Sequence, residues 1–152
     1  MLLIDKDKRF ELKLVGNEFK NSTSYHDSNW LKVQVDVNDG DTNWVAEDNC
    51  LLSYELERLR DWVSGVYEST EDEIRFTENE LAFRFDRDES ILTVVLDFYL
   101  HPSGKQYRYE DGGDCEYLLS FNMNKRKMDA FLSDIVQWIS LFPVKNIENK
   151  GK

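Results

Sequence analysis

The chain has 152 residues, 41% of them hydrophobic and 13% aromatic, which suits one domain with its own buried core. Asp and Glu number 30 against 19 Lys and Arg, so the formal net charge is −11. A field of this sign repels phosphate backbones and disfavours direct nucleic-acid binding, whereas it attracts a basic protein. Acidity also keeps many proteins soluble, so charge alone does not assign a function.

The apolar residues give no sign of a membrane protein or a secreted one. No run reaches the ~18 consecutive apolar residues of a membrane span. The apolar start, Leu2 to Ile4, is far too short for a signal peptide. Cys50 and Cys115 offer neither a disulfide framework nor a Cys-x-x-Cys metal spacing, so we expect two reduced, packed thiols in a cytoplasmic protein.

Alternation of apolar and polar residues predicts three strands before the first helix. The first strand is predicted over residues 10–14 and ends at Gly16, and residues 17–29 form a polar loop. Leu31 to Val37 alternates in the same way, with Val33 and Val35 on the apolar face. Asp39-Gly40 then predicts a hairpin turn, from which residues 44–46 return as the partner strand.

The next segment has the spacing of an amphipathic helix, with apolar residues recurring at steps of three and four. These residues are Leu52, Leu56, Leu59, Trp62, Val63 and Val66. Ser53 precedes the run and can cap the helix with its hydroxyl, and Gly65 helps to end it.

The second half repeats the plan of strands followed by a helix. Short strands are predicted over 74–76 and 81–85, a longer inner strand over 91–100, and a last strand over 117–121. A final amphipathic helix begins near Lys125, contains Met128 to Phe142, and ends at Pro143. The order β-β-β-α-β-β-β-β-α predicts an α+β domain over residues 1–144: an antiparallel sheet of about six to seven strands with two amphipathic helices packed on it, followed by a flexible tail over 145–152.

The segment from Asp27 to Trp62 also carries a family resemblance. His26 to Leu31, the strand after it, and Asp48 to Leu52 leading into the helix resemble the WapI-like immunity proteins, which neutralise toxins deployed between competing bacteria. Phe142-Pro143-Val144 adds a fainter match after the last helix. The resemblance implies that the partner is a cognate toxin domain, but function must still be argued from the surface.

The candidate catalytic and metal motifs are weak. His26-Asp27-Ser28 joins a base, an acid and a nucleophile in adjacent positions, but a triad is assembled in space, so a polar loop is favoured. His101 is expected to be a loop histidine, and Asp36 to Asp41 fits a hairpin turn better than a calcium loop. Gly112-Gly113 lies among acids that would repel a phosphate. We expect no catalytic residue, no cofactor and no metal ligand.

The surface offers three acidic, turn-rich segments as partner-binding candidates. The third is interleaved with tyrosines, which serve well as interface anchors. The candidate residues are Asp36, Asp39, Asp41, Glu71, Asp72, Glu73, Tyr107, Tyr109, Glu110, Asp111, Asp114 and Glu116. Solvated loops are the plainer interpretation, favoured for the first two segments and equal in weight for the third. Lys125 to Lys127 is interpreted as an exposed first helical turn rather than a basic patch.

The leading hypothesis is therefore a stoichiometric inhibitor of a basic toxin domain, with a nuclease as the partner that the charge suits best. The alternatives are an acidic nucleic-acid mimic that inhibits a DNA- or RNA-binding protein and, ranked last, a small-molecule enzyme. Carboxylates at phosphate-like intervals on one face would favour the mimic, and a deep pocket with a histidine or a carboxylate pair would favour the enzyme. The sequence does not determine the oligomeric state.

Overall fold

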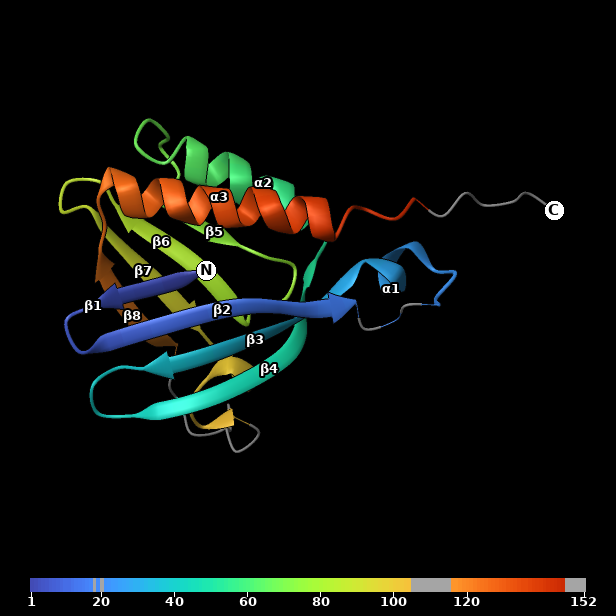
Figure 1. The fold of residues 1–152 in the computed structure, drawn as a ribbon, viewed down its shortest axis with the longest axis horizontal. Helices are drawn as coiled ribbons and strands as arrows, with labels where there is room; N and C mark the ends of the chain where they lie inside the picture. The colour runs from blue at the N-terminus through green and yellow to red at the C-terminus, as the bar shows by residue number, and fades with distance from the viewer. Residues whose placement is uncertain (18, 20, 105–115, 147–152) are drawn as a thin grey trace.

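The computed structural model describes residues 1–17, 19, 21–104 and 116–146, and Figure 1 shows the arrangement of their helices and strands. Within these residues, eight strands form two antiparallel sheets of four strands each, with the strands of each sheet in chain order. Sheet A contains β1 (Leu2–Asp5), β2 (Lys8–Asn17), β3 (Trp30–Asn38) and β4 (Asn43–Leu52). Sheet B contains β5 (Glu73–Arg75), β6 (Leu81–Asp86), β7 (Ile91–Leu96) and β8 (Tyr117–Asn122).

Two amphipathic helices, α2 (Glu55–Ser64) and α3 (Lys125–Leu141), lie side by side across one end of the two sheets (Figure 1). The apolar stripe of α2 buries Leu56, Leu59 and Trp62, as its spacing predicts. Phe131 of α3 packs against Phe83 of β6, with ring centroids 5.4 Å apart. One buried cluster therefore joins both sheets and both helices, and it is the hydrophobic core of the protein.

The predicted α+β class, the antiparallel pairing and the two amphipathic helices are confirmed, but the prediction of one sheet was wrong. The chain passes from β4 through α2 to β5, and β4 does not pair with β5, so the strands divide into two sheets. The additional strand is β1, which the sequence pattern hid because Leu2 and Ile4 are about half exposed and only Leu3 is buried.

Other differences are local. Residues 17–29, predicted as a loop, contain the short helix α1 (Tyr25–Asn29), which Ser24 caps by accepting from the Asp27 amide. Ser53 does not cap α2: its hydroxyl donates to the Asn29 carbonyl, and the helix begins after Tyr54. Gly65 does follow the last residue of α2.

The predicted strand over 91–100 is shorter than expected but is an inner strand. β7 pairs with β6 on one side and β8 on the other, and it ends at Leu96. Asp97 then accepts a hydrogen bond from the Phe98 amide and begins the 3₁₀ turn η1 (Phe98–Leu100). No helix in the described part of the chain is long and apolar enough to cross a bilayer.

The two sheets are also linked at their edges. The Asp5 carboxylate accepts from the backbone and side-chain nitrogens of Asn122, at 2.9 and 2.8 Å, which ties β1 to β8. At the other edge, Trp44 of β4 donates to the Leu100 carbonyl at 3.0 Å. In the predicted C-terminal tail, the Lys145 backbone exchanges hydrogen bonds with the Asn29 side chain, and residues 147–152 lie outside the described residues.

Candidate partner-binding face

The outer face of sheet B carries a group of charged side chains that strand geometry places together. Side chains alternate across a strand, so the buried Ile74 of β5 leaves Glu73 and Arg75 on the opposite, outer side. In the register of β5 with β6, Glu73 lies directly opposite Arg84. Cross-strand neighbours of opposite charge attract each other, so the register itself creates an ion pair.

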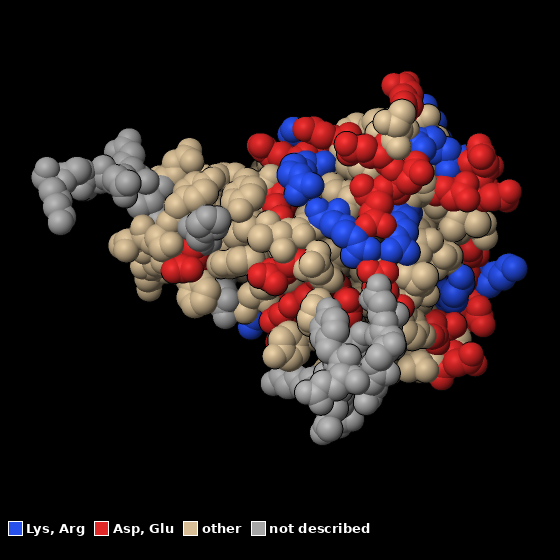
Figure 2. Space-filling model, turned by 180° about the vertical axis from the view of Figure 1, so that it is seen from behind, with Lys and Arg blue, Asp and Glu red and all other residues tan. Residues whose placement is uncertain are grey.

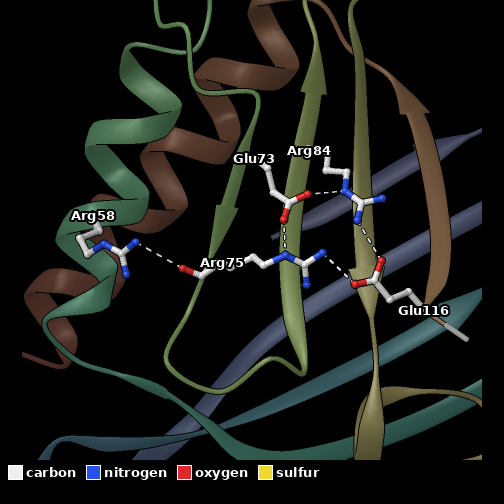
Figure 3. Close-up of polar contacts among 5 residues, drawn as sticks. All are labelled: Arg58, Glu73, Arg75, Arg84 and Glu116. Atoms are coloured by element: carbon white, nitrogen blue, oxygen red, sulfur yellow. Dashed lines mark hydrogen bonds and ion pairs between the residues drawn. The ribbon is translucent and has the colours of Figure 1, made fainter. Parts of the chain in front are cut away.

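Glu116, which immediately precedes β8, completes a closed ring of four residues (Figure 3). Glu73 accepts hydrogen bonds from Arg75 and from Arg84. Glu116 accepts from the same two arginines, at 2.8 and 2.9 Å. Each arginine thus contacts both carboxylates, and the charges within this ring, which we call the Glu–Arg ring, sum to zero.

The ring changes the ionisation of its carboxylates in the direction expected for paired acids. Desolvation raises the pKa of Glu73, but the hydrogen bonds from Arg84 and Arg75 outweigh it and hold the pKa below its ordinary value. The four side chains are between 17% and 36% exposed, so solvent screens each pair and the network counts for more than any single contact.

Helix α2 fixes the free edge of β5 beside the ring. Arg58 donates to the Arg75 carbonyl at 3.3 Å (Figure 3), and the Trp62 indole nitrogen donates to the Glu71 carbonyl at 3.2 Å. The first bond satisfies a carbonyl that edge strand β5 would otherwise expose, and the second satisfies a carbonyl in the segment that leads into β5. β5 has only three residues, and it is held from both sides.

Two open clefts flank the ring. One, of about 480 Å³, lies toward α2 and is lined by Arg58, Asp61, Trp62, Ser69, Glu71, Glu73, Ile74 and Arg75. The other, of about 560 Å³, lies over β6 and the turn that follows, and is lined by Asp72, Glu73, Arg84, Phe85, Asp86, Arg87, Asp88 and Thr93. In the space-filling view of this side, Lys and Arg gather centrally and Asp and Glu surround them (Figure 2). An acidic rim thus encloses a neutralised centre.

A family model places the chain among known proteins. The model of the Immunity protein WapI-like family matches residues 1–143. The chain belongs to this family. The match extends well beyond the segment from Asp27 to Trp62, since it includes both sheets, both long helices and the whole Glu–Arg ring. No curated protein and no solved structure matches the chain.

Two of the three acidic segments predicted for this immunity protein meet at the candidate face. Glu73 of the second segment and Glu116 of the third lie in the ring, and Asp72 forms an ion pair with Arg87. Glu71 is exposed and lines the first cleft. Tyr107, Tyr109, Glu110, Asp111 and Asp114 lie outside the described residues, so their role stays a prediction.

The first acidic segment belongs to sheet A instead. Asp36 of β3 forms an ion pair with Arg9 at 3.3 Å. The Asp39 carboxylate accepts from the amides of Asp41 and Thr42, at 2.9 and 2.7 Å, and so closes the β3–β4 hairpin turn. Asp41 is exposed. The structure therefore gives Asp36 a contact that joins β3 to β2, and gives Asp39 contacts that close the β3–β4 hairpin.

The arginines of the face are absent from the residues predicted to bind the partner, which were carboxylates and tyrosines. Arg75 lies two positions after Glu73, the spacing at which side chains share a strand face, and that signal was available. The Arg84–Glu73 pairing depends on register, and Arg75 and Glu116 are 41 positions apart. Contacts of that range could not be read from the sequence.

The weak motifs have structural roles in this immunity protein. The Ser28 hydroxyl donates to the Tyr25 carbonyl, and His101 Nδ1 accepts from the Ser103 amide, as in an ordinary loop. Burial raises the pKa of the Cys50 thiol well above its ordinary value, which suits a packed, unreactive thiol; Cys115 lies outside the described residues. Among the residues that the structure describes, no group of three or more His, Cys, Asp or Glu could hold a metal ion.

Proposed function

We propose that this protein neutralises a cognate bacterial toxin domain by binding it stoichiometrically in the cytoplasm, and that the toxin is a basic nuclease. Family membership supports an immunity role. The net charge of −11 supports a basic partner, because complementary charge accelerates encounter and disfavours wrong partners. A nuclease fits because it must carry Lys and Arg to hold substrate phosphates.

The observation that carries the proposal is the acidic rim around the Glu–Arg ring. Asp86 and Asp88 are exposed beside the second cleft, and Glu71 is exposed beside the first. These carboxylates can pair with the Lys and Arg side chains that otherwise hold the substrate of the nuclease. Binding of this kind blocks the toxin without catalysing a reaction, so the proposed role is not enzymatic and requires no cofactor.

The ring makes the face suitable for a basic partner. Unpaired, Arg75 and Arg84 would repel the toxin; in the ring, Glu73 and Glu116 balance their charge. The four side chains hold one another before the partner arrives, so little side-chain freedom is lost on binding. The surrounding carboxylates then determine the sign of the face.

The proposal is tested with Asp86→Asn combined with Asp88→Asn. We expect the affinity for the toxin domain to fall about tenfold, mainly through slower association that loses its salt dependence, as measured by surface plasmon resonance. The matched control is Glu57→Gln combined with Asp129→Asn, which removes two exposed charges from α2 and α3 and leaves the face intact. Equal losses in both double variants would argue against this face as the binding site.

The distribution of charge also bears on the nucleic-acid mimic. A mimic requires carboxylates at the regular intervals of phosphates, but on this face Arg58, Arg75, Arg84 and Arg87 alternate with the acids. That mixture favours a protein partner with both charges at its surface. A host DNA-binding protein that competes with the toxin for the face would support the mimic instead.

A further inference from the structure

A second group of carboxylates lies where the two sheets meet, and in it Glu80 is buried and Asp48 is partly exposed. Asp48 of β4 lies directly across from Val33 of β3 in the strand register. Paired residues of neighbouring strands share one face of the sheet, and Val33 is fully buried in the core. Asp48 therefore projects from the inner face of sheet A, next to Trp44 and Ala46 in the same alternation.

Glu80 meets Asp48 from sheet B. It immediately precedes β6, is only 7% exposed, and its carbonyl accepts from the Asp97 amide at 2.9 Å. Its side chain lies within hydrogen-bonding reach of Asp48, and its Oε2 atom is buried with no hydrogen-bond partner among the residues that the structure describes. Two carboxyl groups can form a hydrogen bond only when one of them carries a proton.

Within the described residues, the charged groups that act most strongly on Glu80 come from three parts of the chain, and these three groups are acidic. Asp48 belongs to β4, Glu78 to the segment between β5 and β6, and Asp97 to the junction of β7 and η1. Burial, followed by the hydrogen bond with Asp48 and these negative charges, raises the pKa of the Glu80 carboxyl to about 9. Glu80 and Asp48 also contribute, after burial, to the raised pKa of the Cys50 thiol.

We propose that Asp48 and Glu80 share one proton at neutral pH, and that this shared proton joins edge strand β4 of sheet A to the start of β6 in sheet B. The Glu80 carboxylic acid donates its O–H to the Asp48 carboxylate. Release of the proton leaves two adjacent carboxylates, of which Glu80 is buried, so the cost of desolvation and the repulsion between the two charges weaken the contact of the two sheets at this edge. Neither residue lines the clefts of the partner-binding face, and the proposal is independent of the toxin.

The direct test is a carbon-13 NMR titration of the side-chain carboxyl groups in the full-length protein. We expect one glutamate carboxyl to keep the chemical shift of a protonated acid at pH 7, to titrate near pH 9, and to be absent from Glu80→Gln. The wild-type titration with through-bond assignment is decisive even if the variant folds poorly. A wild-type Glu80 that titrates below pH 6 would overturn the proposal.

A second variant tests the partner of the proton. Asp48→Asn removes the neighbouring charge and supplies an amide donor, so the Glu80 midpoint should fall by roughly one pH unit or more. Glu78→Gln is the matched control, because it removes a nearby charge that makes no hydrogen bond to Glu80, and its shift should be smaller. An unchanged midpoint in Asp48→Asn, or an equal shift in the control, would contradict a proton shared with Asp48.

Discussion

Glu73 in the Glu–Arg ring and Glu80 at the join between the sheets are seven positions apart in the chain, yet their environments push them toward opposite protonation states. Hydrogen bonds from Arg75 and Arg84 favour the ionised form of Glu73. Glu80 lies in a drier site with acidic neighbours, and its protonated form is favoured. The formal net charge of −11 counts all 30 Asp and Glu residues as ionised and takes no account of where they are paired, so it overstates the negative charge at both of these sites.

The largest expected effect concerns stability at alkaline pH. The folded-state pKa of Glu80, about 9, lies above the ordinary 4.5, so folding binds a proton throughout that interval. This contribution to stability is complete below pH 4.5 and is lost as pH rises toward 9, by about 1.4 kcal/mol per pH unit. In Glu80→Gln, whose amide can still donate to Asp48, the free energy of unfolding in urea should depend much less on pH.

The control for that measurement is Glu57→Gln, an exposed glutamate of α2. It should reproduce the wild-type pH dependence between pH 6 and 9. A wild-type stability that does not fall in this interval, or falls equally in Glu80→Gln, would remove the contrast between Glu80 and the ring.

The second effect is smaller and of opposite sign. Glu73 has a folded-state pKa below 4.5, so its contribution is present above that value and is lost as pH falls through the folded-state pKa. Glu73→Gln should cost about 1 kcal/mol at pH 7, because partial exposure screens the pairs, and should cost nothing once acid has protonated the wild type. Urea unfolding of both proteins is measured at pH 7 and at lower pH values through the titration of Glu73, which carbon-13 NMR locates in the wild type. A cost that does not change across that titration would mean that packing, rather than charge, explains it.

The fold was predictable wherever one buried face imposed a period. Val33 and Val35 marked β3, and Leu56 and Leu59 marked α2, because a regular apolar pattern depends only on local geometry. β1 lacks such a pattern, and the division into two sheets depends on which strands pair after α2. That choice is a long-range packing outcome, which the local pattern does not contain.

The site was predictable only in part, for the same reason. Glu73 and Glu116 were both among the predicted residues, but of the four ring contacts only the one between Glu73 and Arg75 had a local signal in the sequence. The alternation of Trp44 and Ala46 could have placed Asp48 inside, but its partner Glu80 lies in the other sheet. The role predicted for Tyr107 and Tyr109 remains a prediction.

A third effect separates the two regions by their response to salt. Ions screen exposed charges over about 10 Å at 0.1 M and about 3 Å at 1 M, but reach buried pairs far less. At pH 7, the loss of unfolding free energy caused by Glu73→Gln should therefore fall to a few tenths of a kcal/mol in 1 M sodium chloride. At pH 8.5, the difference in the free energy of unfolding between the wild type and Glu80→Gln should change little between low salt and 1 M sodium chloride. Equal attenuation of both differences would show that solvent reaches the Asp48–Glu80 pair.

The smallest expected effect tests whether the ring depends on α2. Arg58 is 57% exposed; it makes one long hydrogen bond, 3.3 Å, to the Arg75 carbonyl and a distant ion pair, 3.9 Å, with Glu55 of its own helix. Arg58→Gln should therefore cost less than about 0.5 kcal/mol in urea unfolding at pH 7. It should also leave the Glu73 titration unchanged, because the ring contains no atom of α2. A cost as large as that of Glu73→Gln, together with a raised Glu73 midpoint, would mean that the ring itself depends on the contact between α2 and β5 and that the four ring residues do not hold one another unaided. The ring would then be part of the contact between α2 and sheet B. The difference in protonation between Glu73 and Glu80 would in that case depend on the packing around each residue as well as on the neighbouring charges.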